Sequence, residues 1–242
     1  MANSTVIRRK DMKEPDRFQV LANQASQWLA ARKKKVTLAG GVAVAVVVVV
    51  GIVAAVQSSR AEAAGFAASA LLQMVNAPVG TPAAEGAAGK TFPTNEAKQQ
   101  AIVAEADKVL TQYRGSHPAV LAELVKANAL YALKDWDKAA GGYQQFLADA
   151  PADDSLRFGA LQGLALAAEA KGDLAGAAQA WERMEREAPL FADQADLERA
   201  RVLAASGKLE EARQLLQKFP ENHKDSGLVE QASEQLAALG AK

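Results

Sequence analysis

An uninterrupted apolar stretch, Val36 to Val56, constrains this chain more than any other feature. Its 21 residues carry no charge and a single hydroxyl group. A helix rises about 1.5 Å per residue, so this stretch would span roughly 30 Å, the thickness of the hydrocarbon core of a bilayer. Because a lone segment in lipid must satisfy its own backbone hydrogen bonds, we predict a transmembrane helix over residues 36–56.

The charges on the two sides of this stretch predict its orientation. Residues 1–35 carry a net charge of +6, with four consecutive basic residues from Arg32 to Lys35, whereas residues 57–242 carry a net charge of −6. Basic residues stay on the cytoplasmic side, so the N-terminus is expected inside and the long C-terminal part outside. In a bacterium this corresponds to a single-pass inner-membrane protein with a periplasmic domain. A cleaved signal peptide is the alternative, although the length of the stretch and the 35 residues before it favour an uncleaved anchor.

Two features near the anchor each allow two interpretations. Residues 15–31 have an apolar stripe at helical spacing, which fits either an amphipathic helix on the inner membrane surface or a helical lead-in to the anchor. Small residues four positions apart inside the anchor fit either a helix–helix contact or chance in a segment rich in alanine and glycine. The pairs are Ala39/Ala43, Gly41/Ala45 and Gly51/Ala55.

Beyond the anchor, the sequence predicts an all-α fold. Residues 57–95 are expected to form a membrane-proximal helix followed by a loop rich in proline, glycine and alanine. From residue 96 to 242, helix-forming residues dominate and no stretch has the alternating pattern of a strand. The few glycines and prolines are spaced so that they separate helices.

The segment 96–242 repeats itself with a period close to 35 residues. Each copy has a turn, a small residue five positions later, a large apolar residue four positions further, another three later, and a closing proline. The turns are predicted at Lys134, Gly172 and Gly207. The small residues are Ala139, Ala177 and Ala212, and the large ones are Tyr143, Trp181, Leu216, Phe146, Met184 and Phe219. The packing of two antiparallel helices explains this order. They need a tight turn between them, a small residue where they cross and a proline that ends the second helix.

This pattern resembles the tetratricopeptide-repeat family, which implies a solenoid of antiparallel helix pairs. Pro151 and Pro189 match the closing proline, whereas Pro220 comes early and predicts a shorter or distorted third repeat. An incomplete earlier repeat is also expected, with residues 61–76 as its first helix and Ala106, Leu110 and Tyr113 in its second. Residues 226–239 are expected to form the capping helix that such arrays need.

The resemblance implies a concave protein-binding groove lined by the first helix of each repeat. The expected groove residues are Asn128, Tyr131, Gln162, Leu166, Glu169, Gln194, Leu197 and Arg201. Ordinary surface or packing roles are the alternative for several of them. Some family members bind a C-terminal carboxylate through lysine, asparagine and arginine, and only Asn128 and Arg201 resemble that set.

The sequence offers no support for an enzyme, a cofactor or a metal site. It has no cysteine, and His117 and His223 have no metal-ligand spacing. No phosphate-binding glycine motif and no nucleophile motif is present, and the acidic C-terminal part does not favour nucleic acid.

The whole layout, with a basic tail, one anchor and a tetratricopeptide-like domain outside, resembles the ancillary subunit of the SecYEG translocon. That resemblance implies a scaffold that links the translocon to periplasmic chaperones. Two other functions remain open from the sequence: a cell-envelope assembly or division factor that uses the same repeats, and a structural oligomeriser in which copies stack.

Overall fold

The computed structural model describes Leu21, Ser26 and residues 33–80 and 90–240, with backbone but not side chains over residues 33–45. Within these ranges the chain is all-helical and contains no strand, only an isolated bridge between Val79 and Phe92. Contacts divide the chain into two units, residues 1–59 and residues 60–242. The predicted helix over residues 15–31 lies almost entirely outside the described residues.

Helix α2 (Lys33–Val75) contains both the predicted anchor and the predicted membrane-proximal helix. No glycine or proline separates Val56 from Arg60, so nothing in the sequence breaks the helix there. Among the described residues, Val46–Val75 is the one helical segment long and apolar enough to cross a membrane by length and composition.

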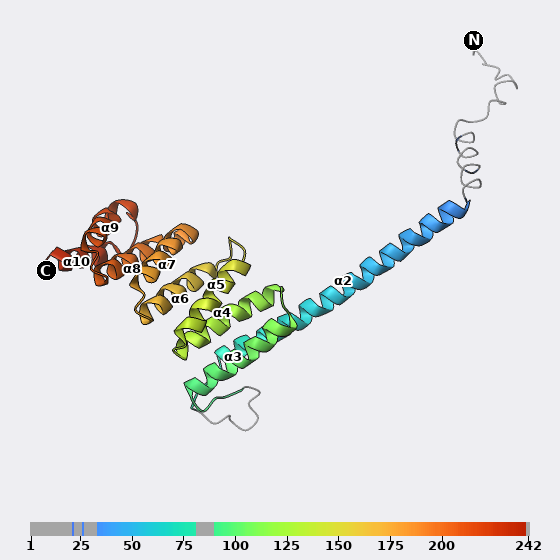
Figure 1. Cartoon of the computed structure of the whole chain (residues 1–242), viewed down its shortest axis with the longest axis horizontal. Coiled ribbons are helices and arrows are strands. Elements are labelled where there is room, and N and C mark those ends of the chain that lie inside the picture. The colour runs from blue at the N-terminus through green and yellow to red at the C-terminus, as the bar shows by residue number, and fades with distance from the viewer. Residues whose placement is uncertain (1–20, 22–25, 27–32, 81–89, 241–242) are drawn as a thin grey trace, which may run out of the picture. The chain divides into compact units, whose positions relative to one another are not determined.

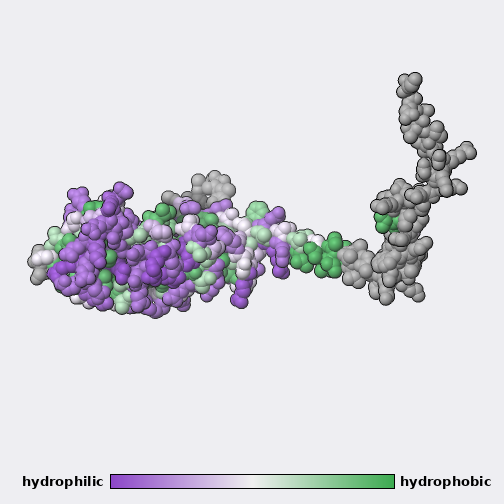
Figure 2. Space-filling model, turned by 90° about the horizontal axis from the view of Figure 1, so that it is seen from above, coloured by the Kyte–Doolittle hydropathy of each residue, from purple (hydrophilic) through white to green (hydrophobic). Residues whose placement is uncertain are grey.

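The exposure of α2 changes along its length. Its large apolar side chains from Val46 to Val56 are 48–70% exposed, and Figure 2 shows hydrophobic surface along this stretch beside a largely hydrophilic surface over the later helices. From Ala64 onward, every third or fourth side chain is buried, as Leu71 and Met74 are. The part of α2 that remains uncovered by protein therefore ends before Ala64.

The end of α2 and helix α3 (Asn95–Gln112) form the first helix pair (Figure 1). Leu71 and Met74 pack against Ile102, Ala106 and Val109 in one buried cluster. Between the two helices, residues 80 and 92 are joined by a hydrogen bond: the backbone N–H of residue 80 donates to the carbonyl of residue 92 at 2.9 Å. This pair corresponds to the incomplete repeat that the sequence predicts.

Three more helix pairs and a last helix follow, each packed against its neighbours in chain order (Figure 1). The pairs are α4 (His117–Ala132) with α5 (Trp136–Asp149), α6 (Arg157–Ala170) with α7 (Leu174–Glu187), and α8 (Ala192–Ala205) with α9 (Leu209–Asn222). A short 3₁₀ turn, η1 (Pro189–Phe191), precedes α8, and α10 (Val229–Gly240) ends the array.

The three predicted turns are confirmed. Lys134, Gly172 and Gly207 have φ angles of 62°, 79° and 83°, the left-handed conformation that reverses a chain after a helix. Lys134 adopts this conformation although it carries a side chain, which makes its turn the strained one of the three.

The core confirms the predicted periodicity. The three small residues Ala139, Ala177 and Ala212 are fully buried where helices cross, and the six large apolar residues of the second helices are at most 2% exposed. Gly163 has a comparable role, because a Cβ placed on it would lie 2.3 Å from the ring of Tyr143. The ring of Tyr143 thus packs directly on the backbone of α6.

Of the two outcomes predicted for Pro220, a shorter or a distorted third repeat, the shorter repeat is wrong. Helix α9 continues through Pro220 to Asn222 and has 14 residues, as α5 and α7 do. Pro220 lies near the last turn of α9, where its missing N–H removes one i→i−4 hydrogen bond and the helix nevertheless continues. Pro151 and Pro189, in contrast, do follow the ends of their helices.

The second helices differ at their N-termini. Asp135 and Asp173 cap α5 and α7, with side-chain oxygens that accept from the N–H groups of Lys138 at 3.5 Å and Gly176 at 2.9 Å. Helix α9 follows Lys208 and has no side-chain hydrogen bond at its N-cap.

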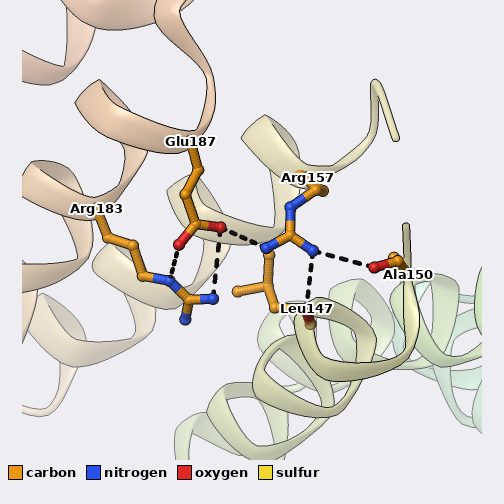
Figure 3. A network of polar contacts seen from close by, with 5 residues as sticks. All are labelled: Leu147, Ala150, Arg157, Arg183 and Glu187. Atoms are coloured by element: carbon orange, nitrogen blue, oxygen red, sulfur yellow. Dashed lines mark hydrogen bonds and ion pairs between the residues drawn. The ribbon is translucent and has the colours of Figure 1, made fainter. Parts of the chain in front are cut away.

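Arg157, at the start of α6, joins three helices (Figure 3). One guanidinium nitrogen donates to the carbonyls of Leu147 at 2.9 Å and Ala150 at 3.2 Å, which end α5 and lack partners within that helix. The other pairs with Glu187 at the end of α7, which also binds Arg183. Arg157 is only 8% exposed, so this network fastens one repeat to the next from within.

Candidate protein-binding groove

The predicted groove residues all lie on the first helices α4, α6 and α8, and we call the surface that these helices form the first-helix face. Asn128 and Arg201 are exposed, and five of the others are half-buried. These five are Tyr131, Gln162, Leu166, Glu169 and Gln194.

Leu197 is the exception and does not belong to an open surface. Its side chain is 2% exposed and packs in a cluster with Leu216, Phe219 and Ala232 from α9 and α10. The repeat spacing that places Leu197 on the groove therefore locates a core residue instead, whose cluster contains Leu216 and Phe219 of α9.

Two buried aromatic residues reach the first-helix face with their polar ends. The hydroxyl of Tyr143 donates to Oδ1 of Asn128 at 2.8 Å, and Nε1 of Trp181 donates to Oε1 of Glu169 at 3.3 Å. Burial raises the pKa of the Tyr143 hydroxyl, so it stays a neutral donor. The contact occupies Oδ1 of Asn128, and the residue as a whole is exposed.

A charge cluster connects α6 to α8 on the same face. Arg201 binds both carboxylate oxygens of Glu169, at 2.8 and 2.9 Å, and also binds Glu198 at 2.7 Å. A single nitrogen, Nη2, contacts both oxygens of Glu169, while Nε binds Glu198. Arg201 therefore already holds two carboxylates of its own chain through Nε and Nη2.

The groups that remain available on this face are mostly amides and partly exposed apolar side chains. Within the described residues, the side-chain amides of Gln162 and Gln194 make no hydrogen bond. Tyr131 and Leu166 are half-buried and rest on the core. Amide groups can both donate and accept, which suits the backbone of a bound chain.

The opposite face, formed by the second helices, has two depressions that the sequence did not indicate. One lies between α3 and α5, has a volume of about 660 Å³ and is lined by Leu110, Arg114, Glu123 and Asp149 among others. The second lies between α5 and α7, has a volume of about 360 Å³ and is lined in part by Gln144, Leu164 and Gln179. Their lining residues are far apart in the sequence, so only the packing of successive helices reveals them.

No group of three or more histidine and acidic side chains that could hold a metal ion occurs among the described residues. His117 begins α4, and His223 follows α9 and contacts Asp196.

Known proteins resemble the chain in its repeats. A family model described as tetratricopeptide repeat matches residues 122–153 and 194–226, which correspond to α4–α5 and α8–α9. No curated protein matches the chain in sequence. Among solved structures, the nearly identical TPR-like repeats of a Podosopora anserina protein described as a kinesin light chain are similar, with 16% identity and a TM-score of 0.43.

That similarity covers 60% of this chain and 88% of the kinesin light chain structure. A single-substitution variant of the same repeats gives 16% identity, a TM-score of 0.43 and coverage of 60% and 87%. The fold is a tetratricopeptide-like solenoid of helix pairs, as the sequence predicts. Such repeats imply a scaffold for protein–protein interaction, and no enzyme family is indicated.

Proposed function

We propose that this tetratricopeptide-repeat chain is a membrane-anchored scaffold that binds proteins on the outer side of the membrane. The observation that carries the proposal is helix α2. Its apolar side chains from Val46 to Val56 are uncovered by protein, and its end is built into the first helix pair. An anchor of this kind confines the repeats to the membrane surface and raises their effective concentration near membrane partners.

The proposed topology rests on the basic residues before the anchor. Arg32 to Lys35 stand directly before the apolar stretch, whereas the first basic residue after it is Arg60. By the positive-inside rule, the N-terminus is cytoplasmic and the repeats are periplasmic in a bacterial host. The proposed partition is a tail over residues 1–35, an anchor over 36–56, a connecting segment over 57–95 and the repeat domain over 96–242.

A fusion of alkaline phosphatase after Lys242 tests this topology. The enzyme is active only outside the cytoplasm, so the fusion should be active and a cytoplasmic reporter at the same position inactive. The opposite pattern would refute the orientation.

The proposed binding surface is the first-helix face. Free amides on Gln162 and Gln194 and half-exposed Tyr131 and Leu166 suit an extended peptide or a partner helix that offers backbone groups and a few apolar side chains. The intramolecular pairing of Arg201 with Glu169 disfavours recognition of a C-terminal carboxylate through Arg201.

The layout supports a finer proposal about the partners. A basic tail, one anchor and an external tetratricopeptide-like domain resemble the ancillary subunit of the SecYEG translocon, so we propose the translocon and periplasmic chaperones as partners. The anchor then holds the first-helix face where translocated chains emerge.

Site-specific crosslinking in membranes tests the surface and the partner together. A photoreactive residue at position 162 or 194 should give adducts, whereas the same residue in place of Gln179, exposed on the opposite face in α7, serves as the matched control. Adducts with SecY or periplasmic chaperones, identified by mass spectrometry, would support the full proposal. Adducts with envelope-assembly proteins or between copies would refute the translocon link, and equal yields at all three positions would refute the surface.

A further inference from the structure

The last turns of α2 have an apolar outer face that is exposed. Ala64, Ala68 and Leu71 are buried on the side where this helix packs against α3. Phe66, on the opposite side of the helix, is 78% exposed, and Leu72 is 39% exposed. The end of α2 therefore has one apolar face in the core of the first pair and a second one turned away from that core.

The two ends of the repeat array differ in this respect. At the C-terminal end, α10 packs on α9 and exposes polar side chains, those of Glu230, Gln231, Ser233 and Glu234. Repeat arrays need such polar faces at their ends, because the last unit has no neighbour to bury its outer side. The outer face of α2 is apolar instead, so it does not have the composition of a finished end.

A groove lies beside this outer face at the end of the helix. Its volume is about 710 Å³, and its lining includes the apolar side chains of Ala70, Leu72, Met74 and Pro78. Grooves of this kind bind a partner helix through apolar side chains at positions i, i+3, i+4 and i+7. The shape and lining of the groove therefore suit the apolar stripe of an amphipathic helix.

Two lysine ammonium groups at the groove have no carboxylate partner among the described residues. Nζ of Lys90, which lines the groove, lies 3.9 Å from Sδ of Met74, and a thioether sulfur is a weak acceptor. Nζ of Lys98 donates to the carbonyl of Ala77, another lining residue, at 2.8 Å. Unpaired positive charge beside an apolar groove favours an occupant that carries negative charge.

A second copy of this chain would not supply that negative charge. Two copies anchored in the same membrane have the same orientation, so their outer faces would meet in parallel with equal residues opposite each other. The one acidic residue of α2 is Glu62, one helical turn before Phe66 on the same side. It would face its own equivalent instead of Lys90, and like charges in contact are destabilising.

We propose that the outer face of α2 and the adjoining groove bind an acidic amphipathic helix of a partner protein. We call this surface the α2 docking face, and it comprises Phe66, Ala70, Leu72, Gln73 and Lys90. The apolar stripe of the partner helix packs on Phe66 and Leu72, and a carboxylate near one end of that helix pairs with Lys90. The proposal rests on the proposed scaffold function, but it uses a surface separate from the first-helix face.

Site-specific crosslinking of the full chain in membranes tests the docking face. A photoreactive residue in place of exposed Gln73 should give adducts, and mass spectrometry should map them to a helical segment with an apolar stripe and an acidic residue. Lys90→Glu should lower the adduct yield roughly fivefold, because it turns an exposed ion pair into a repulsion. Reversing the charge of the mapped acidic residue to lysine should restore the yield with Lys90→Glu.

Lys218→Glu is the matched control, since Lys218 is an exposed lysine of α9 without an ion pair among the described residues, and it should leave the yield unchanged. Equal yields with Lys90→Glu and Lys218→Glu would overturn the proposal, as would a mapped segment without an acidic residue. Adducts at position 73 that join two copies, or that contain lipid, would also overturn it. Positions 162 and 194 report on the first-helix face separately, so adducts there with none at position 73 would refute the docking face and leave the proposed function intact.

Discussion

Replacing Arg157 with alanine is expected to destabilise the repeat array strongly, although the residue is not one of the proposed binding residues. The guanidinium serves three acceptors: the carbonyls of Leu147 and Ala150 and the carboxylate of Glu187. Alanine would leave both carbonyls at the end of α5 without their donor and would leave Glu187 with Arg183 alone.

The size of the effect follows from burial. Removing one partner of a buried ion pair typically costs about 3–5 kcal/mol. Glu187 is 29% exposed and keeps a second arginine, which places the expected loss near the lower end, at about 3 kcal/mol. For an array of this length, that loss should lower the melting temperature by roughly 6–12 °C.

Thermal and urea unfolding of the full chain in detergent micelles measure this effect. Arg183→Ala is the matched control, since Arg183 binds the same Glu187 but its side chain is 35% exposed, and its loss should cost only about 0–1 kcal/mol. An Arg157→Ala variant as stable as Arg183→Ala would refute the conclusion that Arg157 fastens the repeats.

Three further substitutions test the packing, the turn and the anchor. Gly163→Ala places a Cβ against the Tyr143 ring and should cost roughly 1–3 kcal/mol in urea unfolding, whereas Gly159→Ala, with open space around it, should stabilise α6 by about 0.5–1 kcal/mol. Equal effects would contradict the close approach. Lys134→Gly removes the strain of a side chain at positive φ and should raise the free energy of unfolding by about 1 kcal/mol. This gain appears as a higher urea midpoint, so a lower midpoint would contradict the strain. Val53→Arg should disfavour membrane integration by roughly 3 kcal/mol, measured by alkaline extraction, and an unchanged membrane fraction would argue against this segment as the span.

Much of the fold could be predicted from the sequence because the same pattern of turn, small residue and large apolar residues recurs in each repeat. The spacing of Lys134 to Gly172 and Gly207 predicts its turn, even though lysine alone gives no sign of a positive φ. Pro220 does not end its helix as its sequence position suggests, because Leu216 and Phe219 pack in a buried cluster that holds the end of α9.

The polar contacts between repeats could not be predicted from the sequence. Arg157 and Glu187 are 30 residues apart, and Asp196 and His223 are 27 apart, so neither pair has a local pattern. The burial of Leu197 depends on how α9 packs against α8, which the repeat spacing does not contain. The ion pair of Arg201 with Glu169 likewise depends on how α6 packs against α8, which the sequence does not show.

The second helices differ in whether a side chain caps their N-terminus, and this difference predicts at which end the array unfolds first. In a solenoid each pair is stabilised chiefly by its neighbours, so partial unfolding starts at the end with the weakest unit. Helix α9 has no side-chain N-cap and contains Pro220, whereas α5 and α7 are capped by Asp135 and Asp173. We therefore expect the array to fray from its C-terminal end in steps while the pairs next to α2 stay folded. A partner bound across several repeats would then lose its contacts gradually, one helix pair at a time.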